Sequence, residues 1–216
     1  MTKGSMKVKV CGLNDVSNVS EVVQLQPNFI GLIFHDKSPR NCNMAFNVVR
    51  DLNLGTTKKV GVFVNESKDK LLRTVTEFGL DYVQLHGGES VAYCKELIAS
   101  GLKLIKVFSI DDSFDMNDTN AFQFCDYLLF DTKGKNPGGN GIQFNWDILN
   151  KYKGAVPFIL SGGLELKHLS FLQEISQSYP LLSVLDINSK FEIKPGLKDI
   201  GLVGEFINGI NMNKHV

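Results

Sequence analysis

Hydrophobic residues gather in eight short runs along the chain, with more polar segments between them. The runs are five to eight residues long and recur roughly every 20 to 30 residues. Several are nearly continuous in Val, Ile, Leu and Phe, which is typical of strands covered on both faces. This pattern predicts eight buried strands, at residues 7–13, 29–34, 58–64, 82–86, 103–110, 127–132, 157–162 and 183–188.

Segments with helical spacing lie between several of these runs. Residues 67–79 begin with a serine that can cap a helix and end on a glycine, and residues 89–101 end on a glycine as well. Residues 111–123 are rich in turn-forming Asp and Asn, so the pattern does not decide whether this segment is helical. Residues 197–210 are predicted to be helical because four apolar residues share one face: Leu202, Val203, Phe206 and Ile210.

Eight strand–helix units in one chain predict an α/β protein that forms a single (β/α)8 TIM barrel with a parallel, eight-stranded sheet. The alternative is an open, doubly wound sheet. The number of units favours closure, as does the absence of a Gly-x-Gly-x-x-Gly motif after the first run. No linker interrupts the chain, so we expect one domain over residues 1–216, with residues 1–6 as a disordered or dispensable extension.

Composition narrows the classes of partner and the compartment. The chain has 23 basic and 23 acidic residues and a pI near 6.9, which argues against a broad surface for nucleic acid or anionic membrane. The opening residues lack the apolar core of a secretory signal, and the longest apolar runs are too short to span a bilayer. Cysteines at 11, 42, 94 and 125 are too scattered for a zinc site and indicate a reducing compartment. We therefore expect a cytoplasmic protein without nucleic-acid or membrane partners.

Cys11, at the end of the first run, is a candidate catalytic base. The active sites of parallel barrels lie at the carboxyl ends of the strands. Lys9 lies on the same side of the strand, one layer below, and its ammonium is expected to lower a thiol pKa that starts near ~8.5. The thiolate would then act as a nucleophile or general base. The alternative is a buried cysteine that serves only as a small apolar side chain.

Asp131 ends the sixth run and is a candidate general acid. This role requires a carboxyl that keeps its proton near neutral pH, so burial is expected to raise its pKa. The alternative is a helix cap, or a salt bridge in the loop with Lys133 or Lys135. The glycine-rich residues 136–141 that follow are either a lid over the substrate or an ordinary loop.

Glycines after the seventh run and a hydroxyl after the eighth form a candidate phosphate site. Gly162 and Gly163 stand between a predicted strand and helix, where backbone N–H groups can approach an anion. Ser189 adds a hydroxyl after the eighth run, and the loops after these two strands commonly bind phosphate in such barrels. The alternative is that the two glycines serve only the geometry of a turn.

Four more polar residues lie at strand ends and are candidates for substrate binding. Arg40 follows the second run, and its planar guanidinium is suited to binding a carboxylate of a substrate. The alternative is that Arg40 is a charged residue on the solvent-exposed surface. Gln84 and His86 lie on the same side of the fourth run and either line a pocket or satisfy each other. Asp186 lies near the end of the eighth run.

Taken together, these segments resemble one family, phosphoribosylanthranilate isomerase. The matching segments occur in the family order over about residues 7–200, and their combination is much more specific than any one of them. They are KVCGLND, IGLIFHDKSPR, VGVFVNE, VQLHGGES, LLFDTKGKNPGGNGIQFNW, FILSGGL and LDINSKFEIKPGLKD.

The resemblance implies an aldose–ketose isomerase of tryptophan biosynthesis that performs an Amadori rearrangement of N-(5′-phosphoribosyl)anthranilate. It implies that Cys11 is the general base and Asp131 the general acid, and that Arg40 holds the anthranilate carboxylate. It places Asp186 in the pocket and the phosphate at four residues: Gly162, Gly163, Ser189 and Lys190. No cofactor or metal is expected, since the reaction moves only protons between adjacent carbons, and the protein is expected to be a monomer or a homodimer.

One departure and two alternatives accompany this resemblance. Many relatives have Ser-Ser-Gly where this chain has Asn188, Ser189 and Lys190, and lysine cannot adopt the positive φ of glycine without cost. One alternative is the histidine-pathway isomerase, which has aspartate at the first-strand position, so Cys11 argues against it. The other is a barrel that binds a phosphosugar without catalysis.

Overall fold

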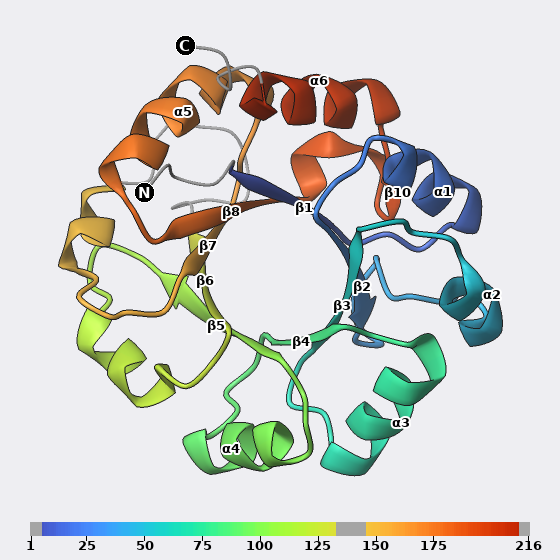
Figure 1. Ribbon diagram of the computed structural model, residues 1–216, viewed down its shortest axis with the longest axis horizontal. Helices are drawn as coiled ribbons and strands as arrows, with labels where there is room; N and C mark the ends of the chain where they lie inside the picture. The colour runs from blue at the N-terminus through green and yellow to red at the C-terminus, as the bar shows by residue number, and fades with distance from the viewer. Residues whose placement is uncertain (1–5, 133–145, 212–216) are drawn as a thin grey trace.

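A computed structural model describes residues 6–132 and 146–211. Eight parallel strands close into a barrel in chain order, and the register of β1 against β8 pairs Lys7 with Val184 and Val10 with Ile187. The closed ring, visible in Figure 1, confirms the predicted barrel over the open sheet. The strands are β1 Lys7–Cys11, β2 Phe29–Phe34, β3 Lys58–Phe63, β4 Tyr82–Leu85, β5 Leu104–Ile110, β6 Tyr127–Thr132, β7 Phe158–Ser161 and β8 Leu182–Ile187.

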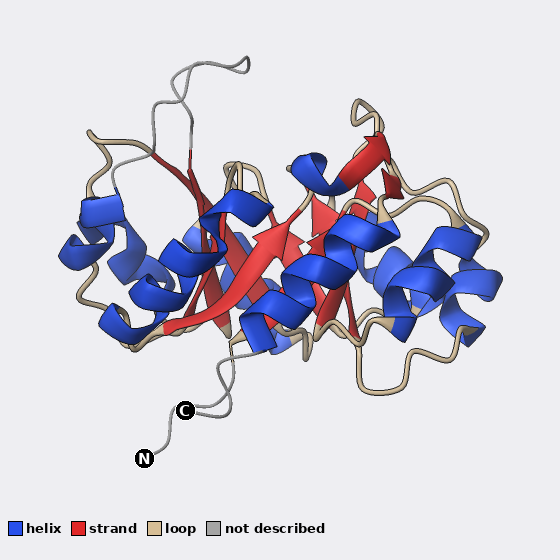
Figure 2. Ribbon diagram, turned by 90° about the horizontal axis from the view of Figure 1, so that it is seen from above, coloured by secondary structure: helices blue, strands red, loops and turns tan. Residues whose placement is uncertain are grey.

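Helices surround the barrel and flank its strands along their length (Figure 2). The α-helices are α1 Val16–Gln24, α2 Phe46–Asp51, α3 Lys68–Phe78, α4 Val91–Ala99, α5 Leu169–Ser178 and α6 Ile200–Asn211. Short 3₁₀-helices complete the connections: η1 Met116–Phe122, η2 Trp146–Lys151, η3 Leu166–His168 and η4 Ser189–Phe191. The apolar faces of these helices cover the outer face of the sheet, as the near-continuous apolar strands require.

The glycine signals for the ends of two helices are confirmed, whereas Ser67, at the N-cap position of α3, makes no capping hydrogen bond with its side chain. Helix α3 ends at Gly79, which adopts a left-handed conformation with φ of 60°. Gly101, with φ of 84°, follows the end of α4. The Asp- and Asn-rich segment forms the 3₁₀-helix η1, whose first turn is capped by Asp115 through a bond from Asn117 N to its carboxylate (2.9 Å).

The predicted helix over residues 197–210 is wrong at its start. Leu197–Lys198 form a short strand, β10, which pairs antiparallel with β9 (Glu192–Lys194). The turn between them contains Gly196 with φ of 86°, so the chain reverses before the helix begins. Helix α6 starts at Ile200, and Asp199 accepts a hydrogen bond from Leu202 N (3.1 Å).

The inside of the barrel is a packed apolar core with an aromatic floor. Phe29 contacts Tyr82 and Tyr127 edge to face, with ring centroids 5.6 and 6.2 Å apart, at the amino ends of the strands. Above them lie side chains from five strands: Val60, Ile105, Val107, Leu129, Ile159 and Val184. This filling closes one end of the barrel and leaves the carboxyl ends of the strands as the open end.

Candidate active site

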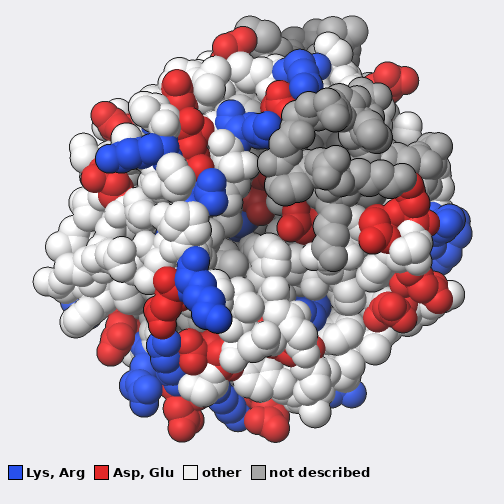
Figure 3. All heavy atoms as spheres, turned by 180° about the vertical axis from the view of Figure 1, so that it is seen from behind, with Lys and Arg blue, Asp and Glu red and all other residues white. Residues whose placement is uncertain are grey.

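A cavity of about 310 Å³ opens at the carboxyl ends of the strands. Figure 3 shows this end of the molecule, with a hollow near its centre that has acidic atoms within it and basic side chains around it. Nine of the ten residues that the sequence singled out for the site line the cavity: Cys11, Gln84, His86, Asp131, Gly162, Gly163, Asp186, Ser189 and Lys190. Side chains that are distant in sequence therefore face one space.

The Cys11 thiol lies at the edge of this cavity, at the last position of β1. The residue is 4% exposed and pairs with Gly31 across the β1–β2 register. A Cβ atom at Gly31 would lie 2.7 Å from the Cys11 sulfur, closer than real Cβ atoms approach their neighbours. The glycine in FIGLIF therefore provides the space that the thiol occupies.

Lys9 and Asp186 form a buried ion pair directly below the thiol. Lys9 Nζ lies 3.1 and 3.0 Å from the two carboxylate oxygens, and β1–β8 pairing sets the residues side by side. Burial lowers the pKa of Lys9, but the charges of Asp186 and of a Cys11 thiolate outweigh it and raise that pKa overall. The lysine is therefore a permanent cation in the barrel interior.

The effect of this cation on Cys11 is weaker than expected. Burial raises the pKa of the Cys11 thiol above its usual value, and the lowering effect of Lys9 does not overcome it. Asp186 raises the same pKa further, because its negative charge lies beside the same lysine. The expectation of a lowered thiol pKa is therefore wrong: desolvation dominates, and the ion pair to Asp186 balances the lysine charge.

Asp131 lies at the end of β6 and shares the cavity with Cys11. Its side chain is 31% exposed, so the burial expected from the apolar run before it is only partial. His86 Nε2 lies 3.5 Å from Asp131 Oδ2. The alternative salt-bridge partners Lys133 and Lys135, and residues 136–141, for which a lid and an ordinary loop were both left open, lie outside the described residues.

Gln84 and His86, from the end of β4, both face the cavity. Gln84 is only 2% exposed, and its Oε1 is the one buried side-chain nitrogen or oxygen in the described part of the chain without a hydrogen-bond partner. An unpaired buried carbonyl costs roughly 1–3 kcal/mol, which favours a role in accepting a hydrogen bond from a ligand. The two side chains therefore do not satisfy each other through this oxygen.

The loops after β7 and β8 line one side of the cavity. Gly162 and Gly163 have φ of 97° and 62°, so only glycine fits the first position and glycine is strongly favoured at the second. Lys190 is not among the described residues with positive φ, and it belongs to the 3₁₀ turn η4 instead. Its ammonium lies 3.8 Å from Glu165, more than half exposed beside the loop.

Arg40 is the exception among the predicted site residues, since it does not line the cavity. Its Nε and Nη2 atoms bind the carboxylate of Glu192 at 2.7 to 3.0 Å. Glu192 and its second partner Lys198 follow β8, and sequence reasoning missed both. The available signal was a run of charged residues just past a strand end, EIKPGLKD, which belongs to a segment that resembles the family and of which we predicted only the last three residues to be helical.

The described residues contain neither a cluster suited to a metal ion nor a helix suited to crossing a membrane. No group of three or more His, Cys, Asp or Glu side chains is arranged to hold a metal ion in that part of the chain. None of the helices described there combines the length and apolar character that crossing a membrane requires.

Comparison with known proteins places the chain in a family. Residues 8–209 match the family model for N-(5′-phosphoribosyl)anthranilate isomerase. A protein of that name from Phocaeicola vulgatus is 40% identical over 204 residues, which cover 94% of this chain and 97% of the relative. The crystal structure of phosphoribosyl anthranilate isomerase from Thermotoga maritima is 29% identical with a TM-score of 0.83, and the match covers 95% of this chain and 98% of that one.

A second solved structure shows a relative with a ligand. It is a phosphoribosyl anthranilate isomerase in complex with reduced 1-(o-carboxyphenylamino)-1-deoxyribulose 5-phosphate. It is 26% identical to this chain with a TM-score of 0.79, and the match covers 95% of this chain and 98% of that one. The family model and the relative that is 40% identical over nearly the full length agree, and the chain belongs to the N-(5′-phosphoribosyl)anthranilate isomerase family.

Proposed function

We propose that this chain performs the isomerisation of its family with Cys11 as general base and Asp131 as general acid. The reaction is the Amadori rearrangement of N-(5′-phosphoribosyl)anthranilate to 1-(2-carboxyphenylamino)-1-deoxyribulose 5-phosphate, a step of tryptophan biosynthesis. One observation carries the assignment: a thiol from β1 and a carboxyl from β6 face the same cavity of about 310 Å³. That volume lies within the range of small-molecule sites.

The proposed steps transfer protons only. Asp131 donates a proton to the ring oxygen of the ribose, the bond from that oxygen to C1 breaks, and the nitrogen lone pair forms an iminium at C1. The Cys11 thiolate then removes the proton from C2, and the electrons of that C–H bond form the enolamine. The enolamine tautomerises to the ketone, so the aldose is converted to a ketose without any external oxidant or cofactor.

The two anionic ends of the substrate fix its orientation in this proposal. The phosphate binds at Gly162, Gly163 and the loop that contains Ser189 and Lys190, where two glycines with positive φ, one hydroxyl and one ammonium line the cavity. The anthranilate carboxylate binds Arg40 at the rim. Between the two ends, the substrate offers hydroxyl and N–H donors, and Gln84 Oε1 is a buried acceptor that has no partner among the described residues.

The near contact between His86 and Asp131 also fits the proposed acid. The imidazole lies 3.5 Å from the carboxyl and comes from the same cavity wall as Gln84. In this proposal the imidazole helps to keep the carboxyl directed toward the cavity. It also offers a second group that can relay a proton to Asp131 after the ring has opened.

The test measures turnover of freshly prepared N-(5′-phosphoribosyl)anthranilate by its loss of fluorescence. The wild-type chain is expected to convert it and to leave the aminoaldose substrate of the histidine pathway unchanged. Cys11→Ala and Asp131→Asn are each expected to lower kcat by about 10² or more, since each removes a proton-transfer group. Activity within a few-fold of wild type in either variant would remove that residue from the mechanism.

We also propose that one chain forms a complete site and that the protein works in the cytoplasm. Every residue assigned above belongs to a single barrel, so a monomer and a homodimer are both expected to be active. The four cysteines, all within the described residues, are free thiols, which suits a reducing compartment. Sedimentation of the active protein at assay concentration distinguishes the two oligomeric states.

A further inference from the structure

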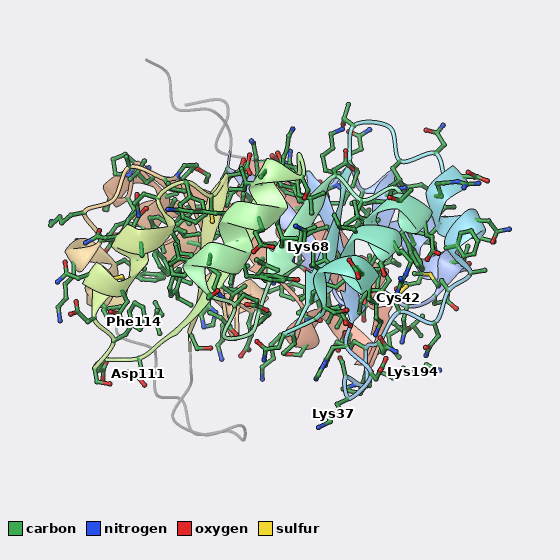
Figure 4. All side chains as sticks on the ribbon, turned by 90° about the horizontal axis from the view of Figure 1, so that it is seen from below. Lys37, Cys42, Lys68, Asp111, Phe114 and Lys194 are labelled. Carbon is green, nitrogen blue, oxygen red and sulfur yellow. The ribbon has the colours of Figure 1, made fainter. Side chains whose placement is uncertain are left out.

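The hairpin formed by β9 and β10 buries two charged side chains beside the cavity. Glu192 on β9 has 4% of its side chain exposed, and Lys198 on β10 has none exposed. Figure 4 shows Lys194 of this hairpin at the same end of the barrel as Lys37, in the loop after β2, and Asp111, which follows β5. The hairpin therefore belongs to the end of the barrel at which the site opens.

Glu192 is the centre of a compact set of donors. Arg40 Nε lies 2.9 and 3.0 Å from the two carboxylate oxygens, and Nη2 lies 2.7 Å from Oε2. Lys198 Nζ and Gly196 N reach Oε1 at 2.6 and 3.1 Å. Burial raises the pKa of Glu192, but the bonds from Arg40 and Lys198 lower it further than burial raises it, so the carboxylate stays ionised.

This set of charges lies next to the catalytic thiol. A Cβ atom at Gly12, the residue after Cys11, would lie 2.8 Å from Arg40 Cδ and 2.7 Å from Asn188 Oδ1. Asn188 lines the cavity and accepts a bond from Lys198 Nζ (2.8 Å). The Arg40 side chain therefore crosses over the end of β1, at the rim of the cavity.

The geometry also leaves part of the arginine unused. A bidentate pair fixes the plane of a guanidinium, and here it occupies Nε and Nη2. Two basic groups share the single carboxylate of Glu192, and burial lowers the pKa of Lys198 although Glu192 opposes it, so the trio has more basic than acidic groups. A ligand carboxylate at the rim would balance this excess. Without Glu192, the Arg40 guanidinium would lie near Lys198 and would lose the carboxylate that it binds among the described residues.

We propose that Glu192 is a positioning residue that holds Arg40 at the cavity rim in the orientation that receives the aromatic carboxylate of the substrate. This inference rests on the proposed function, which assigns that carboxylate to Arg40. Lys198 supports the arrangement from below, since it joins Glu192 to Asn188 on the phosphate side of the cavity. The hairpin thus connects the two anion-binding ends of the site.

Two stable inhibitors test this role without relying on chemistry. One is the reduced product, 1-(2-carboxyphenylamino)-1-deoxyribitol 5-phosphate, and the other is its phenylamino counterpart, which lacks only the carboxylate. Wild type is expected to bind the first about tenfold or more tightly, the value of one charge-assisted hydrogen-bond pair. Glu192→Gln is expected to remove most of that preference and to change binding of the second by about twofold or less.

Controls separate positioning from folding. Arg40→Met is expected to give the same pattern, and adding Glu192→Gln to it is expected to change nothing further. Ile193→Gln places the same amide at the adjacent, 69% exposed position of the hairpin and is expected to leave both inhibition constants unchanged. If Glu192→Gln does not fold, the double variant Glu192→Gln with Lys198→Met is used instead, because it also removes the buried lysine charge that the single variant leaves unpaired.

The outcomes are distinct. Equal weakening of both inhibitors by Glu192→Gln would show that the residue only supports the hairpin, and unchanged binding of both would show that Arg40 needs no support; either result overturns the inference. If wild type itself does not prefer the carboxylated inhibitor, the assignment of Arg40 in the proposed function fails instead. Turnover of the substrate by wild type checks the reaction independently.

Discussion

Three interior residues at the junction of β1 and β8 determine the properties of the proposed base. Cys11 is buried, which disfavours its thiolate, and Lys9 is the stronger of the two cations that favour the thiolate, the other being Lys198. Asp186 binds Lys9 through both oxygens and so reduces its effect on the sulfur. The thiol therefore has a raised pKa. The fraction of thiolate is expected to increase with pH over a range that lies above the usual pKa of a cysteine.

Replacing Lys9 by methionine is expected to shift the pH dependence of activity upward. Lys9 is the stronger of two cations that lower the pKa of Cys11, so removing it leaves burial and Asp186 opposed only by the weaker effect of Lys198. The rising limb of kcat/KM against pH then moves to higher pH. The measurement is kcat/KM across the alkaline range for wild type and Lys9→Met.

The double variant Lys9→Met with Asp186→Asn serves as the control for that shift. Breaking a buried pair costs about 3–5 kcal/mol, and removing both partners avoids the stranded carboxylate. The double variant is expected to be more stable than Lys9→Met and to have its rising limb at a lower pH. A limb that stays at the wild-type position in Lys9→Met would mean that the lysine does not act on the thiol.

Gly31→Ala is expected to impair catalysis without touching substrate. The added methyl would lie 2.7 Å from the Cys11 sulfur and 3.0 Å from its Cα, so the thiol must turn or β1 must move. A displacement of about 1 Å can cost about 10² in rate, and the overpacked interface costs about 1–3 kcal/mol in stability. Steady-state kinetics should show a fall in kcat larger than any change in KM.

Gly204→Ala is the matched control for this substitution. Gly204 lies in helix α6, and a methyl there would meet Leu25 at an ordinary contact distance of 3.5 Å. It is expected to keep full activity and to gain slightly in stability from the higher helix propensity of alanine. Wild-type kcat in Gly31→Ala would show that the thiol tolerates a new position.

At the level of elements, helix α1 and the hairpin are joined by one side chain. Asn18 Oδ1 accepts from Lys198 N (2.7 Å), and Asn18 Nδ2 donates to Lys198 O (3.0 Å). The helix itself is started by Asp15, whose carboxylate accepts from Asn18 N (2.8 Å). The first helix of the chain thus fixes the strand that carries Lys198, across a sequence separation of 180 residues.

Asn18→Ala is therefore expected to destabilise the protein more than the loss of a few side-chain atoms would suggest. The change removes both bonds and leaves a buried backbone N–H and C=O of Lys198 unpaired, at a cost of about 2–4 kcal/mol. Urea denaturation at constant m-value measures the loss. Ser17→Ala, an exposed position on the same helix, is expected to change stability by about 0.5 kcal/mol or less. Similar values for the two variants would contradict the structural role of Asn18.

At the level of the whole molecule, the sequence predicted the barrel because its strongest signals are repeated. Eight apolar runs required covering on both faces, and closure followed from their number. The hairpin at 192–198 was not predictable in this way, because its strands contain only three and two residues. Its conformation depends on contacts with distant residues such as Asn18 and Arg40, which no local pattern contains.

The candidate site was predictable for the same topological reason. Parallel strands bring their carboxyl ends together, so residues at strand ends face one cavity wherever they lie in the sequence. The electrical environment was not predictable, because it depends on burial and on which charges pair. Asp186 next to Lys9, and Glu192 next to Arg40, appear only once β8 returns to β1.

Phosphate is expected to stabilise the entire barrel, since its proposed site joins loops from β7 and β8 that the unfolded chain keeps apart. Inorganic phosphate at about 100 times its Kd should raise the free energy of unfolding by about 2.7 kcal/mol, which corresponds to about 5–10 °C in Tm for a chain of this size. Lys190→Glu places a negative charge on the cavity wall and should abolish most of that gain. Lys167→Glu reverses a lysine that also pairs with Glu165 but does not line the cavity, so it should keep the gain. Equal gains in the two variants, measured by thermal unfolding, would place the phosphate elsewhere on the molecule.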